Sequence, residues 1–96
     1  MLFALICTDR RGGLETRQAT RPDHLAFLDG LGDDLMFAGP FLDGDGKPNG
    51  SLVVVRAETH EAAEAIAALD PYARADLFET VEIRAWNWAL KAPEGV

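Results

Sequence analysis

The chain has 96 residues, of which 16 are acidic and 9 are basic, so its formal net charge is -7. With 48% hydrophobic residues, the composition excludes a disordered chain and predicts one globular domain over residues 1–96. The negative charge argues against binding to nucleic acid or to anionic membranes, both of which would repel it. Cys7 is the one cysteine, which excludes an internal disulfide; we expect a buried, unreactive thiol and a cytoplasmic protein.

The first expected element is a strand over Leu2 to Thr8 ("LFALICT"), whose unbroken apolar run predicts burial on both faces and is too short to span a bilayer. The segment after it, "DRRGGLETRQAT", is expected to be a polar connection. A helix should then begin near Pro22, because proline suits the first turn of a helix. Its apolar stripe is expected to consist of Leu25, Leu28 and Leu31, with Phe27 beside them.

Two more strands and a second helix follow. The second strand is expected over Leu35 to Phe41, with Gly39-Pro40 near its end, and the third over Ser51 to Ala57. Thr59 is placed to cap the second helix, "HEAAEAIAAL", which should end at Asp70-Pro71 because the residue before a proline is forced out of helical geometry. The expected inner face of this helix consists of Ala62, Ala63, Ile66, Ala67 and Leu69.

After a loop, "TVEIRAWNWAL" alternates as a final strand, with Val81, Ile83 and Ala85 on one face and Trp86 and Trp88 on the other. The order of elements is therefore β-α-β-β-α-β, which predicts an α+β, ferredoxin-like fold with an antiparallel sheet. Two helices cover only one face of such a sheet, yet the first and third strands are apolar on both faces. We expect a second copy to cover the open face in a two-fold homodimer; the alternative is a ligand or a partner protein.

Several blocks of the sequence resemble, in order and spacing, the YCII-related (YciI-like) proteins: "TRPDHLAFLDGL", "FAGPFLDGDGKPNGSLVVV" and "DPYARADLFETVEIRAWN". The resemblance covers roughly Leu2 to Asn87. It implies a dimeric α/β barrel, an active site made of His24 and Asp70, and lyase-type chemistry on hydroxylated or chlorinated aromatics. The chain departs from the family pattern at Asp76, where relatives usually have glycine. We expect this change to alter the loop after Asp70 and to add negative charge near the pocket.

Spacing alone leaves the roles of His24 and Asp70 open. His24 lies at the edge of the predicted apolar stripe, where a histidine is more often a core residue, and Asp-Pro is a common helix-ending pair. Asp70 falls where the negative end of the helix dipole disfavours a carboxylate by about 0.3–1 kcal/mol. If the two side chains meet, the carboxylate would orient the imidazole and balance its charge, as in a general base with its partner.

Four other residues are candidates for binding a small-molecule substrate. Arg21 flanks His24, and its guanidinium fits a carboxylate; Arg17 is a weaker candidate of the same kind, and solvation at the surface is the simpler interpretation of both. Tyr72 would lend a hydroxyl or a ring to the pocket, or would only pack. Ser51 would donate to a ligand, or would merely open the third strand.

No metal site or cofactor is expected. "DGDG" at residues 43–46 lacks the glutamate that closes a calcium loop, and His60 has no Cys or His neighbour at ligand spacing. The function that fits best is cofactor-independent acid–base chemistry of the lyase or isomerase type at His24 and Asp70, to which the resemblance adds a small aromatic or hydroxylated substrate. The alternatives are a non-catalytic module that binds or senses a small ligand, and a structural accessory protein.

Overall fold

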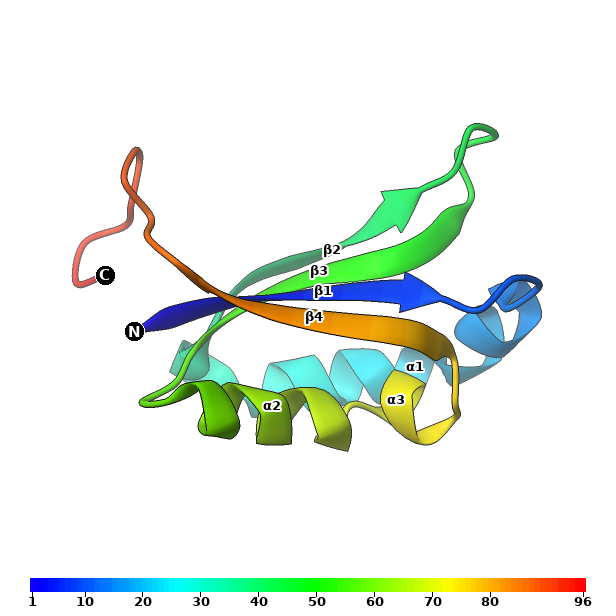
Figure 1. The fold of residues 1–96 in the computed structure, drawn as a ribbon, viewed down its shortest axis with the longest axis horizontal. Coiled ribbons are helices and arrows are strands. Elements are labelled where there is room, and N and C mark those ends of the chain that lie inside the picture. The colour runs from blue at the N-terminus through cyan, green and yellow to red at the C-terminus, as the bar shows by residue number, and fades with distance from the viewer.

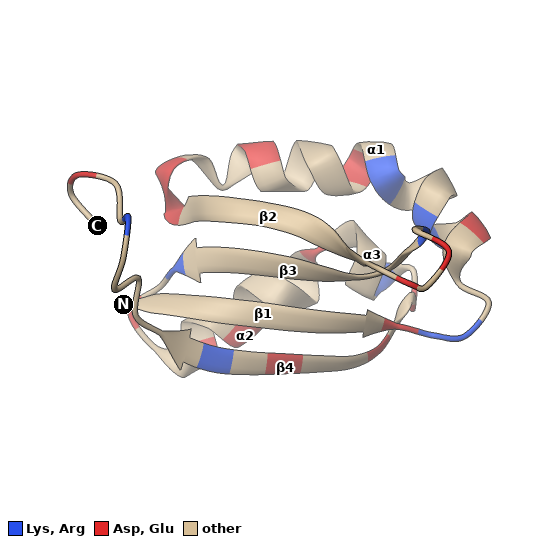
Figure 2. Ribbon diagram, turned by 90° about the horizontal axis from the view of Figure 1, so that it is seen from above, with Lys and Arg blue, Asp and Glu red and all other residues tan.

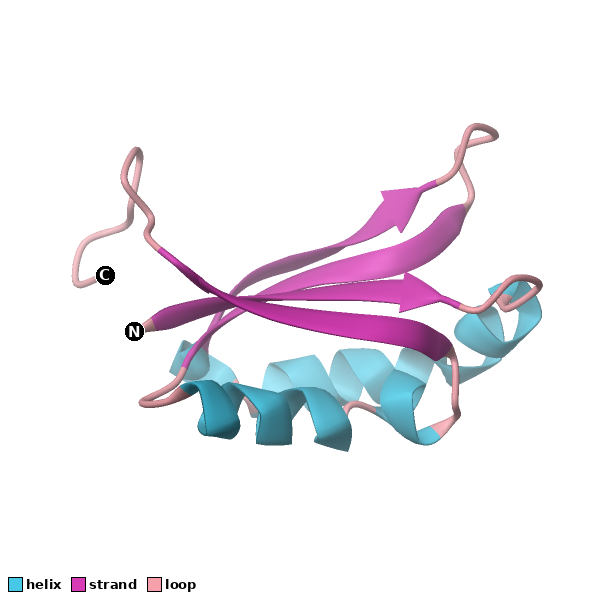
Figure 3. Ribbon diagram, viewed as in Figure 1, coloured by secondary structure: helices cyan, strands magenta, loops and turns pink.

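The computed structural model describes residues 1–96 and shows two layers, a four-stranded sheet with the helices packed against one of its faces (Figure 1, Figure 3). The strands are β1 (Leu2–Asp9), β2 (Leu35–Leu42), β3 (Pro48–Arg56) and β4 (Phe78–Trp86). The helices are α1 (Leu14–Gly30), α2 (His60–Leu69) and the short α3 (Pro71–Arg74), and a 3₁₀ turn (Gly32–Asp34) leads from α1 into β2. The predicted α+β, ferredoxin-like order of elements is confirmed, with α3 as an addition.

The strands lie in the order β2-β3-β1-β4, and each neighbouring pair is antiparallel. Because β1 and β3 are the two central strands, their apolar side chains are buried on the helix face, as predicted. On the open face Ala4 and Val54 are buried, but Ile6 and Leu52 are only partly so. Val55 belongs to the core between sheet and helices, whereas its neighbour Val54 points to the open face, and both are almost completely buried. The core beneath the sheet also holds Phe3 and Leu5 of β1.

Helix α1 begins at Leu14, about two turns before Pro22. The prediction of a polar connection over residues 9–20 was therefore wrong. Gly12 and Gly13 make the turn that starts the helix: Gly12 has a φ of 76°, and a Cβ on Gly13 would lie 2.8 Å from Leu77 Cδ1. Pro22 is exposed inside the helix, which continues despite the one backbone hydrogen bond that proline cannot give.

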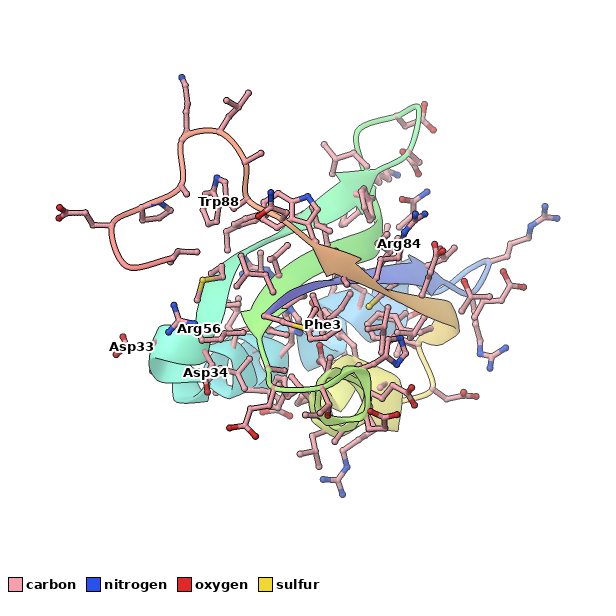
Figure 4. All side chains as sticks on the ribbon, turned by 60° about the vertical axis from the view of Figure 1, so that its left-hand side comes forward. Phe3, Asp33, Asp34, Arg56, Arg84 and Trp88 are labelled. Carbon is pink, nitrogen blue, oxygen red and sulfur yellow. The ribbon has the colours of Figure 1, made fainter.

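Helix α2 begins where predicted, and Thr59 Oγ1 accepts a hydrogen bond from the backbone N–H of Ala62 at 3.0 Å. Its buried face is narrower than expected, because Leu69 is exposed. The expected loop after Asp70 contains α3, whose first residue is Pro71. Strand β4 then starts at Phe78 and ends at Trp86, so Trp88 lies beyond the sheet (Figure 4).

The other face of the sheet carries no helix (Figure 1). Within the strands, charged residues occur at one end of β1 and of β3 and along β4, whereas β2 has none (Figure 2). The register places Glu82 and Arg84 opposite Ile6 and Ala4, on the open face. The register pairs Val81, Ile83 and Ala85 with Cys7, Leu5 and Phe3, which confirms that they share one face and shows that this face is toward the helices. On the open face, an aromatic cluster forms from Phe37, Trp86 and Trp88, with ring centroids 5.0–5.7 Å apart.

Candidate active site

His24 of α1 and Asp70 meet in the structure. Nδ1 of His24 lies 2.9 Å from Oδ1 and 3.0 Å from Oδ2 of Asp70, and the two residues are only 7% and 4% exposed. Because an ionised carboxylate only accepts hydrogen bonds, Nδ1 carries the hydrogen, and Nε2 of the neutral imidazole keeps its lone pair. This is the geometry of a base held by an orienting carboxylate.

Asp70 ends α2 and begins α3. It is the C-cap residue of α2, where the helix dipole is unfavourable, but it is also the N-cap residue of α3, and its Oδ1 accepts from the backbone N–H of Tyr72 at 2.9 Å. Pro71 takes the first position of α3, where its missing N–H has no partner to lose. The Asp-Pro pair therefore ends one helix and starts the next, while it aims a carboxylate at His24.

The ring of Tyr72 connects two side chains of α1. It stacks on the imidazole of His24, with centroids 4.0 Å apart and planes at 18°, and Cζ of Arg17 lies 4.5 Å from its centroid. Arg17 and His24 are two turns apart on one face of α1, about 10 Å along the axis, so the ring lies between them. Burial raises the pKa of Tyr72 above its usual value and outweighs the opposing effect of Arg17 and Arg21.

Arg17 is buried, so its interpretation as a surface residue was wrong. Its Nε and Nη2 donate to the two carboxylate oxygens of Asp9 at 2.7 and 2.8 Å, and Nη2 also donates to Ser51 Oγ at 2.9 Å. Burial alone would lower the pKa of Arg17, but the hydrogen bonds and the charge of Asp9 outweigh it. The pKa of Arg17 is therefore raised above its usual value, and the guanidinium stays charged. Sequence reasoning missed Asp9 because it expected Arg17 to lie in a polar connection. Arg17 instead lies in the first turn of α1, where its side chain is buried against Asp9.

A cavity of about 200 Å³ lies between α1, the helix-facing side of β2 and β3, and α3. Arg21 stands at its exposed rim and forms no ion pair, and Asp70 lies behind His24 and does not line it. Such a volume is small beside the roughly 300–1,000 Å³ of drug-sized ligand sites and suits a small molecule better than a nucleotide. Its polar lining consists of Arg17, Gln18, Arg21, His24, Ser51 and Tyr72.

Asp76 lies away from this cavity, so the negative charge that we expected near the pocket is not there. Its φ of 59° is the left-handed conformation that glycine adopts most easily, which accounts for a glycine preference at this position. Arg10 stabilises the aspartate by donating to its backbone oxygen and to its carboxylate, each at 3.0 Å.

The second histidine, His60, lies outside the site. Its exposed ring is hydrogen-bonded to the carbonyl oxygen of Ile83 at 3.1 Å and to Glu64 at 2.7 Å, and because both partners only accept, they raise its pKa. No group of three or more His, Cys, Asp or Glu side chains is placed to hold a metal ion. None of the helices has the length and apolar character needed to cross a bilayer.

The fold and the site define a small ferredoxin-like α+β protein with a buried His–Asp pair, and a sequence model of the YCII-related domain matches residues 1–87. The chain belongs to the YCII-related family. Protein YciI of Escherichia coli O6:H1 (strain CFT073) is 37% identical over 95 residues, which cover 91% of this chain and 97% of that protein. Protein YciI of Shigella flexneri matches to the same extent.

Several solved structures are similar to this one, among them two that span nearly the whole chain. The 5-chloro-2-hydroxyhydroquinone dehydrochlorinase TftG of Burkholderia phenoliruptrix AC1100, in complex with 2,5-dihydroxybenzoquinone, superposes with a TM-score of 0.85 at 29% identity, over 91% of this chain and 94% of that one. Protein Atu4242 of Agrobacterium tumefaciens gives a TM-score of 0.56 at 15% identity, over 97% and 98% of the two chains. The second likeness concerns the fold alone.

Proposed function

We propose that this protein is a small enzyme of the lyase or isomerase type that works by acid–base chemistry, without a cofactor, on a small aromatic or hydroxylated molecule. The observation that carries the proposal is the His24–Asp70 pair: Asp70 holds Nδ1 and leaves Nε2 as the available base of a cavity-lining side chain. The likeness to TftG supports this chemistry, since that protein is a dehydrochlorinase of a chlorinated, hydroxylated ring.

His24 would move one proton in either reaction. In an elimination, Nε2 takes a proton from an O–H or C–H group of the substrate, the electron pair left behind forms a new double bond, and the leaving group departs with its own bonding pair. The substrate loses H–X in total, and the imidazolium then gives its proton to water. In an isomerisation, the imidazolium returns the proton to a different atom of the same molecule. Asp70 balances the imidazolium charge in both cases.

Three further side chains would hold the substrate. Arg21 offers an unpaired cation at the rim of the cavity, which attracts a phenolate or a carboxylate. Tyr72 and Ser51 line the same cavity, and each carries a hydroxyl group that would bind a polar group of the substrate. These roles follow the expectations from the sequence, and the common cavity is their support.

Chloride release from 5-chloro-2-hydroxyhydroquinone tests the proposal. We expect turnover by the natural protein and a loss of at least about 100-fold in His24→Asn, the range that general acid–base catalysis contributes. Asp70→Asn should also lose activity while it keeps the start of α3, because asparagine is as good an N-cap residue as aspartate.

His60→Asn is the matched control, since His60 is the other of the two histidines and lies outside the cavity. It should turn over at the natural rate. Equal rates for His24→Asn and the natural protein would sink the proposed chemistry. Binding of this ring and of other chlorinated phenols, with no chloride released from any of them, would instead favour the non-catalytic ligand-binding module.

A further inference from the structure

A buried ion pair lies next to His24, and its arginine, Arg17, lines the cavity. Asp9 and Arg17 are joined by two hydrogen bonds, and both side chains are 5% exposed. Breaking such a pair from one side leaves a buried charge without a partner, so separating the two groups is costly. The charge of Arg17 is balanced by Asp9, and the guanidinium is fixed in place by that carboxylate and by the ring of Tyr72.

The fixed guanidinium determines the direction of the hydrogen bond at Ser51. Ser51 Oγ accepts from Arg17 Nη2, and arginine has no acceptor atom, so the serine cannot donate in return. No other atom of the chain accepts the hydroxyl hydrogen of Ser51, although the residue is 2% exposed and lines the cavity. Buried hydroxyl hydrogens usually have an acceptor, so the acceptor for Ser51 has to come from the cavity, either as water or as an oxygen of a bound ligand.

We propose that Ser51 donates a hydrogen bond to an oxygen of the substrate. Arg17, held by Asp9, is the positioning residue: it donates to Ser51 Oγ and so leaves the hydroxyl hydrogen of Ser51 directed at the substrate. The inference rests on the proposed function, because the oxygen in question is the one that becomes negatively charged when His24 takes a proton. Donors fixed before the reaction stabilise such an oxyanion without reorganisation. The substrate class is thereby narrowed to small rings with a carbonyl, enol or phenol oxygen conjugated to the atom that loses the proton.

The test is binding of 2,5-dihydroxybenzoquinone, followed by calorimetry, to variants of Ser51. We expect Ser51→Ala to weaken binding by about 10- to 100-fold, as for a lost hydrogen bond to a charged group. Ser51→Thr keeps the hydroxyl on the strand and should bind within about threefold of the natural protein. Equal affinity of Ser51→Ala and the natural protein would overturn the inference.

Arg17 needs a design that keeps the fold. The double variant Asp9→Val/Arg17→Met replaces the buried ion pair with apolar side chains, a change that other proteins tolerate, and thermal unfolding checks that it is folded. We expect this double variant to weaken binding as much as Ser51→Ala does. The triple variant Asp9→Val/Arg17→Met/Ser51→Ala should lose no further affinity, because all three changes act through one hydrogen bond. Losses that multiply in the triple variant would contradict a positioning role for Arg17.

The two proposals fail in different ways. If Ser51→Ala weakens binding while His24→Asn still releases chloride at the natural rate, the hydrogen bond from Ser51 to the substrate is supported. The role of His24 as the base is then refuted. If the natural protein does not bind 2,5-dihydroxybenzoquinone at millimolar concentration, the inference about Ser51 and Arg17 is overturned, whereas the chloride-release experiment decides on His24 by itself.

Discussion

The Asp70 carboxylate has two hydrogen-bond donors, Nδ1 of His24 and the backbone N–H of Tyr72. The first hydrogen bond orients the proposed base, and the second caps α3. Replacing Asp70 with alanine would remove both. Asparagine separates them, because it keeps a capping oxygen and removes the charge. The position of this residue between two helices is what makes both contacts possible.

Cys7 allows a prediction at the same scale. Its thiol is buried beneath the sheet, and burial, aided by the charge of Asp70, raises its pKa from 9.0 to about 12. We expect the folded protein to be nearly inert to Ellman's reagent at pH 8, and the chain unfolded in urea to react with one equivalent, because only the thiolate is nucleophilic. Rapid reaction of the folded protein would contradict the burial.

The same thiol links stability to pH. Between about pH 9 and 12 the unfolded chain loses a proton that the folded protein retains, so the contribution of Cys7 is complete below pH 9 and is lost as the pH rises through this range. Urea unfolding at pH 8 and at pH 10 measures the loss. Cys7→Ala is the control, since it should remove this part of the pH dependence and leave that of the other groups.

At the scale of single elements, α2 owes its start to Thr59, whose Oγ1 accepts from the N–H of Ala62. We expect Thr59→Ala to lower the free energy of unfolding by about 1 kcal/mol, the usual cost of a lost N-cap. Thr59→Ser keeps the accepting oxygen and should lose much less. Chemical denaturation compares the three proteins, and an unchanged midpoint in Thr59→Ala would show that the cap is dispensable.

Helix α1 shows what the sequence could and could not predict. The pattern of the strands and the apolar residues of α1 were enough to predict the order of elements, because both depend on local periodicity. The expected stripe was wrong in part, since Leu25 is exposed and Leu31 is the C-cap residue. The first residue of α1 was missed because Pro22 suits a helix start, whereas here the helix passes through it. His24, Asp70, Ser51 and Tyr72 were named as candidates from the sequence, but the Asp9–Arg17 pair required the true start of α1.

At the scale of the whole molecule, we propose that the open face of the sheet pairs with a second copy. Its central strands carry Ile6 and Leu52 side by side, and Phe41 remains substantially exposed on β2. Apolar surface of this kind is typical of an interface between copies, and Glu82 and Arg84 of β4 add charged groups at its edge. The aromatic cluster of Phe37, Trp86 and Trp88 covers part of this face within one chain.

Sedimentation equilibrium tests the dimer. We expect the natural protein to be a dimer at micromolar concentration and Ile6→Lys to be a folded monomer, because the substitution places a charge in the middle of the face. Leu69→Lys is the matched control: Leu69 is also an exposed apolar residue, but it lies on α2 in the helical layer, so this variant should remain dimeric. A monomeric natural protein would refute the proposed pairing.

The hydrogen bond between His24 and Asp70 joins residues that are 46 positions apart, and the contact from Arg17 to Ser51 joins residues 34 positions apart. Contacts of such separation form only after much of the chain has collapsed, since each closes a long loop. Nascent or partly folded chains therefore lack both the His24–Asp70 pair and the contact between Arg17 and Ser51. During refolding, the capacity to act on a substrate should return with the last of the native structure and never ahead of it.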